Sequence, residues 1–151
     1  MPFDANLVLV DGSAAWSFAN INTSDYGTPV STTRNAGGFA IIDLGSANIG
    51  VAVSGIAVVL VLMAAAAAGD ELTAIIEESG SSTFASDIHE LGKFDILAAT
   101  KGVILGSECP TVVIIRISPK ERYLRIDASV TAGDNFGLSQ CLLSPYPFRV
   151  L

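Results

Sequence analysis

The sequence predicts an all-β protein, an antiparallel β-sandwich or barrel of about eight strands that follows an N-terminal arm. Three observations lead to this fold class. Short runs of β-branched and aliphatic residues recur along the chain, and turns rich in glycine, proline or asparagine separate them. One run alternates apolar and polar residues throughout, as a half-buried strand does. No stretch has the apolar spacing of a long amphipathic helix.

The length of 151 residues fits one domain, and we place its parts at 1–37, an N-terminal strand with an extended polar arm, and 38–151, the sandwich. Half of the residues are apolar and 15% are charged. This composition supplies a sizeable core and argues against disorder.

Eight segments have the length and composition of strands. They are residues 6–10, 39–44, 51 to about 65, 71–78, 93–97, 112–117, 122–130 and 138–143. The turn Gly69-Asp70 predicts a hairpin between the third and the fourth, and the loop 132–137 predicts one between the last two. Residues 87–92 have the Asp-to-Glu spacing and the following glycine of a single helical turn.

The apolar stretch 51–68 is the ambiguous segment, because its length would also suffice for a membrane helix. Its flanks are acidic, with Asp43 before it and Asp70 and Glu71 after it, and they lack the basic and aromatic anchors of a membrane span. Its continuous part, residues 56–63, is typical of a strand buried on both faces. The alanine run that follows keeps a long hydrophobic helix open.

The alternation in residues 122–130 predicts the core. Leu124, Ile126, Ala128 and Val130 share one face of that strand. We expect this face to lie opposite or near the inner face of the long apolar strand, which carries Val58, Leu60 and Leu62.

The arm is polar between residues 17 and 38 but contains or adjoins aromatic side chains. Such a side chain either contacts a partner or fixes the arm to its own core, and both possibilities stay open. We expect residues 7–10 to join a sheet and residues 17–37 to lie against a neighbouring subunit or a partner. The candidate interface residues are Trp16, Phe18, Tyr26, Arg34, Tyr146, Phe148 and Arg149.

The charge balance and the cysteines exclude several classes of function. The net charge is −7 and the basic residues are scattered, so we expect no nucleic-acid partner. The first residues lack the regions of a signal peptide, and we expect no membrane partner. Cys109 and Cys141 match no metal spacing; we expect two buried reduced thiols, with a single disulfide left open.

The residues predict no catalytic, cofactor or metal site, and therefore no enzyme. His89 is the sole histidine and stands in a polar segment, so we expect a solvated surface residue. Glu77 and Glu78 are adjacent on a strand and must point to opposite faces, so they do not form a hydrolytic pair. We interpret the carboxylates as solvated charges.

Four segments resemble capsid cement proteins, the jelly-roll decoration proteins of Bordetella-type tailed phages. They are Ile42-Asp43-Leu44-Gly45, Leu72-Thr73-Ala74-Ile75-Ile76-Glu77-Glu78-Ser79, Ser82-Thr83-Phe84 and Arg122-Tyr123-Leu124-Arg125-Ile126. The likeness covers about residues 38–143 and consists of strand edges rather than a catalytic signature.

The resemblance implies a jelly-roll sandwich and a structural virion protein on the outer surface of the capsid, made in the cytoplasm of a bacterial host. It implies no cofactor, and it implies two partners: the lattice of the major capsid protein, and the chain itself as a dimer or trimer. Three alternatives remain: a carbohydrate-type binding module on a jelly roll, a hydrolase using Glu77, Glu78, Asp127 and His89, and a membrane protein.

Overall fold

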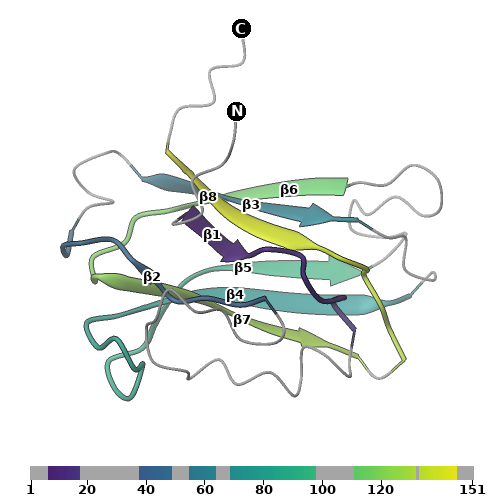
Figure 1. The fold of residues 1–151 in the computed structure, drawn as a ribbon, viewed down its shortest axis with the longest axis horizontal. Helices are drawn as coiled ribbons and strands as arrows, with labels where there is room; N and C mark the ends of the chain where they lie inside the picture. Colours follow the sequence, from purple (N-terminus) through teal and green to yellow (C-terminus); the bar gives the residue numbers. More distant parts are fainter. Residues whose placement is uncertain are drawn as a thin grey trace, which may run out of the picture.

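The computed structural model confirms the predicted fold class, with eight strands in two antiparallel four-stranded sheets (Figure 1). It describes residues 7–17, 38–48, 55–63, 69–97, 111–131 and 133–145, and these ranges contain no α-helix. The two sheets lie one above the other as the two layers of a sandwich.

The strands divide between the layers in an interleaved way. The first sheet has the order β1-β8-β3-β6, and the second has the order β2-β7-β4-β5. Their bounds are β1 Val8–Val10, β2 Ile42–Asp43, β3 Ile56–Leu62, β4 Glu71–Ser79, β5 His89–Leu97, β6 Thr111–Ile117, β7 Tyr123–Val130 and β8 Gln140–Pro145.

The strand pairs are nested about the middle of the chain. The first strand pairs with the last, β2 pairs with β7, β3 with β6, and β4 with β5, all antiparallel. The chain therefore runs as one long hairpin whose two halves alternate between the layers. The expectation that residues 7–10 join a sheet is confirmed, because Val8 lies opposite Leu142 of β8.

The core lies between the two sheets and follows the alternation of the strands. Leu124, Ile126, Ala128 and Val130 of β7 are all buried, as the sequence predicts. On the opposite layer Val58, Leu60 and Leu62 of β3 are fully buried. Each such side chain stabilises the fold by about 1.5–3 kcal/mol when it leaves water.

Both predicted hairpins are wrong. The strands β3 and β4 belong to different sheets, as do β7 and β8, so each connection passes from one layer to the other. The turn residues Gly69 and Asp70 do precede β4. A glycine-containing turn indicates where the chain reverses, but it does not decide whether the next strand joins the same sheet or the other one. Two strands that are each apolar on one face can bury that face as neighbours in one sheet or against each other across the core.

The predicted helical turn at residues 87–92 is also wrong, because β5 already begins at His89 and pairs with β4 along its whole length. The register shifts between Ile76 and Glu77, where Leu91 is the extra residue of a bulge. At Gly92 a Cβ atom would lie 2.9 Å from the side chain of Ile115 in β6. Glycine at this position thus lets the edges of the two sheets approach.

The apolar stretch forms a strand rather than a helix. Its described part is β3, Ile56–Leu62, which is shorter than the predicted strand; residues 51–54 and 64–68 lie outside the described ranges. Within the ranges that the structure describes, no helix is long and apolar enough to cross a membrane.

Candidate interaction site

Trp16 lies in the core, so its side chain is not available to a partner. It is fully buried, and its ring stacks on that of Phe39, with ring centres 5.9 Å apart. The backbone N–H of Trp16 donates to the carbonyl of Gly137, and the N–H of Phe136 donates to the carbonyl of Trp16. The sequence leaves open whether this aromatic side chain contacts a partner or fixes the arm to its own core. The structure shows that Trp16 fixes the start of the arm to its own sandwich.

The other candidate interface residues lie outside the described residues. They are Phe18, Tyr26, Arg34, Tyr146, Phe148 and Arg149. The described part of the arm ends at Ser17, which forms an isolated bridge with Asn135.

The segments that carry the family resemblance come together in one sheet, although they are distant in the sequence. Ile42 of β2 lies opposite Leu124 of β7, and Leu124 in turn lies opposite Glu78 of β4. The loop after β4 brings Phe84 beneath the guanidinium of Arg125, whose central carbon lies 4.5 Å from the ring centre. These segments therefore build one continuous part of the β2-β7-β4-β5 sheet.

An ion pair marks the edge of this region. The guanidinium of Arg122 donates to both carboxylate oxygens of Asp43, at 2.7 and 2.8 Å. These hydrogen bonds, together with one from the backbone N–H of Gly45, hold the pKa of Asp43 below its usual value. Both side chains are partly solvent-exposed, so the pair positions the start of β7 more than it stabilises the fold.

A second ion pair crosses the outer face of the same sheet. The guanidinium of Arg125 donates to Glu77 at 2.7 Å, and both side chains are mostly buried. Asp127 lies two residues further along β7, and burial raises its pKa, with a smaller contribution from the negative charge of Glu77 and an opposing one from Arg125. Arg125, Glu77 and Asp127 thus form a partly buried group of charges on the outer face of this sheet, with the ring of Phe84 packed against the guanidinium of Arg125.

Glu78 departs from the interpretation of the carboxylates as solvated charges. It is 3% exposed and points into the sandwich, opposite to Glu77, which confirms that the two side chains face different ways. One of its oxygens accepts hydrogen bonds from the backbone N–H groups of Lys120 and Glu121, at 2.7 and 2.9 Å. A buried carboxylate is tolerated here because these two donors satisfy it.

The proposed hydrolytic residues do not form one group. Glu78 faces inward, Glu77 and Asp127 lie on the outer face, and His89 is exposed on β5. In the part of the chain that the structure describes, no three His, Cys, Asp or Glu residues are placed to hold a metal ion. Cys141 is a free, buried thiol, and burial raises its pKa, so it packs as a small apolar side chain.

The outer face of the β1-β8-β3-β6 sheet carries a second surface, which the sequence analysis missed. Val59 lies opposite Ile114 and Val61 lies opposite Val112, and Met63 follows at the end of β3. Val112, Ile114 and Met63 are each about half exposed, between 47% and 53%. We name these five residues the apolar face.

A signal for the apolar face is present in the sequence. Residues 56–63 and 112–115 are apolar at both alternating sets of positions, and for residues 56–63 this pattern predicts burial on both faces. In β3 the inner positions are buried, whereas Val59 and Val61 on the outer side are only half-buried. A two-layer sandwich supplies no third layer for that side.

No known protein family matches the chain, and no curated protein matches it significantly.

Proposed function

We propose that this protein is a structural virion protein, a capsid cement protein that binds the outside of a tailed-phage head and bridges and stabilises capsomers. One observation carries the proposal. The segments that resemble cement proteins in the sequence assemble into one continuous part of the β2-β7-β4-β5 sheet, where Arg122 pairs with Asp43 and Arg125 pairs with Glu77. Surfaces of fixed ion pairs on a stable scaffold suit lattice contacts, which need complementarity rather than catalysis.

The strand order supports the jelly-roll part of the proposal. The nested pairs β1–β8, β2–β7, β3–β6 and β4–β5 alternate between two sheets, as two interleaved Greek keys would arrange them (Figure 1). Jelly rolls occur both in viral capsid domains and in lectins, so the fold alone does not decide between the two functions.

The described aromatic side chains favour the cement protein over the carbohydrate module. Sugar-binding faces use exposed aromatic rings as platforms. Of the aromatic residues in the described ranges, all but Tyr123 are buried. The guanidinium of Arg122 lies over the ring of Tyr123, 5.2 Å from its centre, and occupies the position that a sugar would take.

The test is binding to heads. Heads of the phage that encodes this chain, stripped of it, are mixed with the purified protein and sedimented, and isolated shell subunits are treated in parallel. We expect saturable binding to heads and much weaker binding to subunits, because a lattice presents contacts from several subunits at once. Equal affinity for both, or absence of the chain from purified virions, contradicts the proposal. A glycan array with a positive, competable signal favours the alternative.

A further inference from the structure

The loop between β4 and β5, residues 80–88, holds two of its residues in the left-handed region of the backbone. Phe84 has a φ of 50° and Asp87 has a φ of 53°. Aspartate adopts this conformation more readily than most residues, but a bulky aromatic residue rarely does. Such backbone persists only where the surrounding structure fixes it, and it gathers at functional sites. We name this segment the 80–88 loop.

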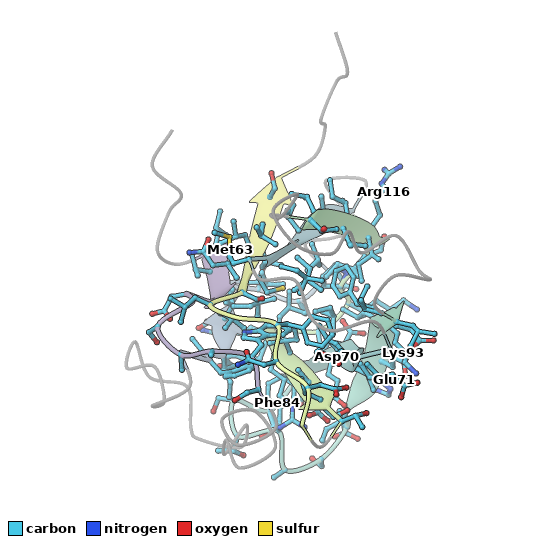
Figure 2. All side chains as sticks on the ribbon, turned by 90° about the vertical axis from the view of Figure 1, so that its right-hand side faces the viewer. Met63, Asp70, Glu71, Phe84, Lys93 and Arg116 are labelled. Atoms are coloured by element: carbon cyan, nitrogen blue, oxygen red, sulfur yellow. The ribbon has the colours of Figure 1, made fainter. Side chains whose placement is uncertain are left out.

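Phe84 is fixed by the sheet beneath the loop. Its side chain is buried, and its backbone N–H donates to the carbonyl of Ser81 at 3.1 Å. The central carbon of the Arg125 guanidinium lies 4.5 Å from the centre of its ring, and Arg125 is itself held by Glu77. Figure 2 shows Phe84 at the bottom of the molecule, away from Met63 of the other sheet. The ring therefore ties the 80–88 loop to the outer part of β7.

A buried hydroxyl holds the two ends of the loop together. Ser79, the last residue of β4, is fully buried. Its hydroxyl donates to the carbonyl of Ser86 at 2.9 Å and accepts a hydrogen bond from the N–H of Ser81 at 3.0 Å. The hydroxyls of Ser81 and Thr83 also lie 3.0 Å apart. The shape of the loop is thus set before a partner binds, so binding does not lose the entropy of ordering it.

The loop presents an apolar side chain between two negative charges. Ile88, its last residue, is 41% exposed. Asp87 and Glu90 flank it and are exposed, and the sequence contains no Lys or Arg between residues 79 and 92. Glu90 lies opposite Glu77 in the sheet, and Glu77 is already paired with Arg125. A partner that covers Ile88 therefore has to offer basic groups around an apolar contact.

We infer that the 80–88 loop is the contact by which the chain recognises the shell protein: Ile88 fills an apolar pocket of the shell, and Asp87 and Glu90 meet basic side chains at its rim. The inference rests on the proposed cement function and names the contact that the function needs. An apolar anchor inside a polar rim is the usual arrangement of the residues that dominate an interface. Figure 1 shows the loop, in teal, projecting from the left-hand end of the lower sheet.

A second copy of the chain is a poor partner for this loop. The net charge of the chain is −7, and such a contact would bring Asp87 and Glu90 close to other carboxylates, which costs free energy.

The test measures the dissociation constant of the full chain on heads stripped of it. Ile88→Ala is expected to raise this constant at least about tenfold, because the anchor loses most of its apolar contact. Glu90→Lys is expected to raise it at least about fivefold and to weaken its dependence on salt, since ions screen attraction between exposed opposite charges. Both positions are exposed, so circular dichroism is expected to show the wild-type fold.

Leu138→Ala is the matched control. Leu138 is 55% exposed and lies in the connection from β7 to β8. The end of β7 lies beside the start of β4, since Val130 is opposite Leu72, so this connection is at the other end of the sheet from the 80–88 loop. Leu138→Ala is expected to change the dissociation constant by less than about twofold.

Ser79→Ala tests whether the loop has to be held in shape. It removes the hydroxyl that joins the two ends of the loop and is expected to raise the dissociation constant at least about threefold. If Ser79 acts by positioning Ile88, then Ile88→Ala weakens binding less in the Ser79→Ala background than in the wild type. Effects that simply multiply would overturn the positioning role of Ser79.

The outcomes separate the inference from the proposed function. A folded Ile88→Ala variant that binds heads as the wild type does overturns the inference and leaves the cement function standing. Equal losses from Ile88→Ala and Leu138→Ala, or an affinity that Glu90→Lys leaves unchanged, also overturn it. A wild-type chain that does not bind heads contradicts the cement function itself, and the inference with it.

Discussion

The carboxylate of Glu78 holds the turn between β6 and β7, accepting a hydrogen bond of 2.7 Å from the backbone N–H of Lys120, 42 residues further along the chain. The same oxygen accepts a bond from the N–H of Glu121. This turn leads directly into Arg122 and Arg125, the two cations of the ion pairs on the sheet that also contains Glu78. One buried side chain therefore positions the part of the sheet that we propose contacts the capsid.

The first prediction concerns this bond. Glu78→Ala is expected to lower the free energy of unfolding by about 1–3 kcal/mol, because two partly buried N–H groups lose their acceptor. Glu78→Gln keeps an acceptor oxygen but loses its charge and is expected to cost about half as much. Urea unfolding measures both. Glu90→Ala, at an exposed position on β5, is the control, and an equal loss there would contradict the role of Glu78.

The second prediction concerns the core. Leu124 is fully buried on β7, and Leu124→Asp is expected to leave the chain unfolded. Truncation of such a side chain alone costs about 2–5 kcal/mol, and an unpaired buried charge adds to this, against a total stability of about 5–15 kcal/mol. Ser129→Asp places the same charge on the exposed side of the same strand and is expected to remain folded.

Circular dichroism and size-exclusion chromatography distinguish the two variants. A folded Leu124→Asp protein with a thermal transition near that of the wild type would show that the inner face of β7 is wrongly assigned.

The sequence predicts the inner faces because they depend on local alternation. Leu124, Ile126 and Val130 follow one another at every second or fourth position, and this pattern alone places them on one side of a strand. The pairing of strands depends on contacts far apart in the chain, such as Val8 with Leu142. No local pattern encodes that choice, and so both predicted hairpins failed.

The site was less predictable for the same reason. Whether Trp16 faces a partner or its own core is decided by Phe39, on which it stacks. Whether Glu78 is solvated or buried is decided by the backbone of the β6–β7 turn. The apolar face had a local signal, but its exposure follows from the number of layers, which composition and spacing do not give.

The third prediction concerns pH. The raised pKa of Asp127 means that the folded state binds more protons than the unfolded state between the ordinary value of 3.8 and the raised value. The free energy of unfolding therefore falls as the pH rises through this window. Asp127→Asn removes the unfavourable charge and is expected to increase stability near neutral pH.

The advantage of Asp127→Asn should shrink as the pH falls through this window and should be lost below 3.8, where the wild-type carboxyl is protonated in both states. Urea midpoints of both proteins across this range measure the difference. A stabilisation that does not change with pH, or a loss of stability near neutrality, would show that the interaction of Asp127 with Arg125 outweighs burial and the charge of Glu77.

The last prediction separates the two parts of the arm. Trp16 belongs to the core, so Trp16→Ala is expected to cost about 3–5 kcal/mol and to lower the melting temperature strongly.

Replacing residues 18–35 by a short Gly-Ser linker keeps Trp16 and the bridge of Ser17 with Asn135. It is expected to leave the thermal transition nearly unchanged, because the free energy of loop closure varies slowly with length. The linker variant should nevertheless bind heads more weakly or assemble less, since the replaced segment carries Phe18, Tyr26 and Arg34. Calorimetry and head sedimentation on the same preparations decide: a collapsed melting temperature with unimpaired binding would mean that these residues serve the chain's own sandwich rather than a partner.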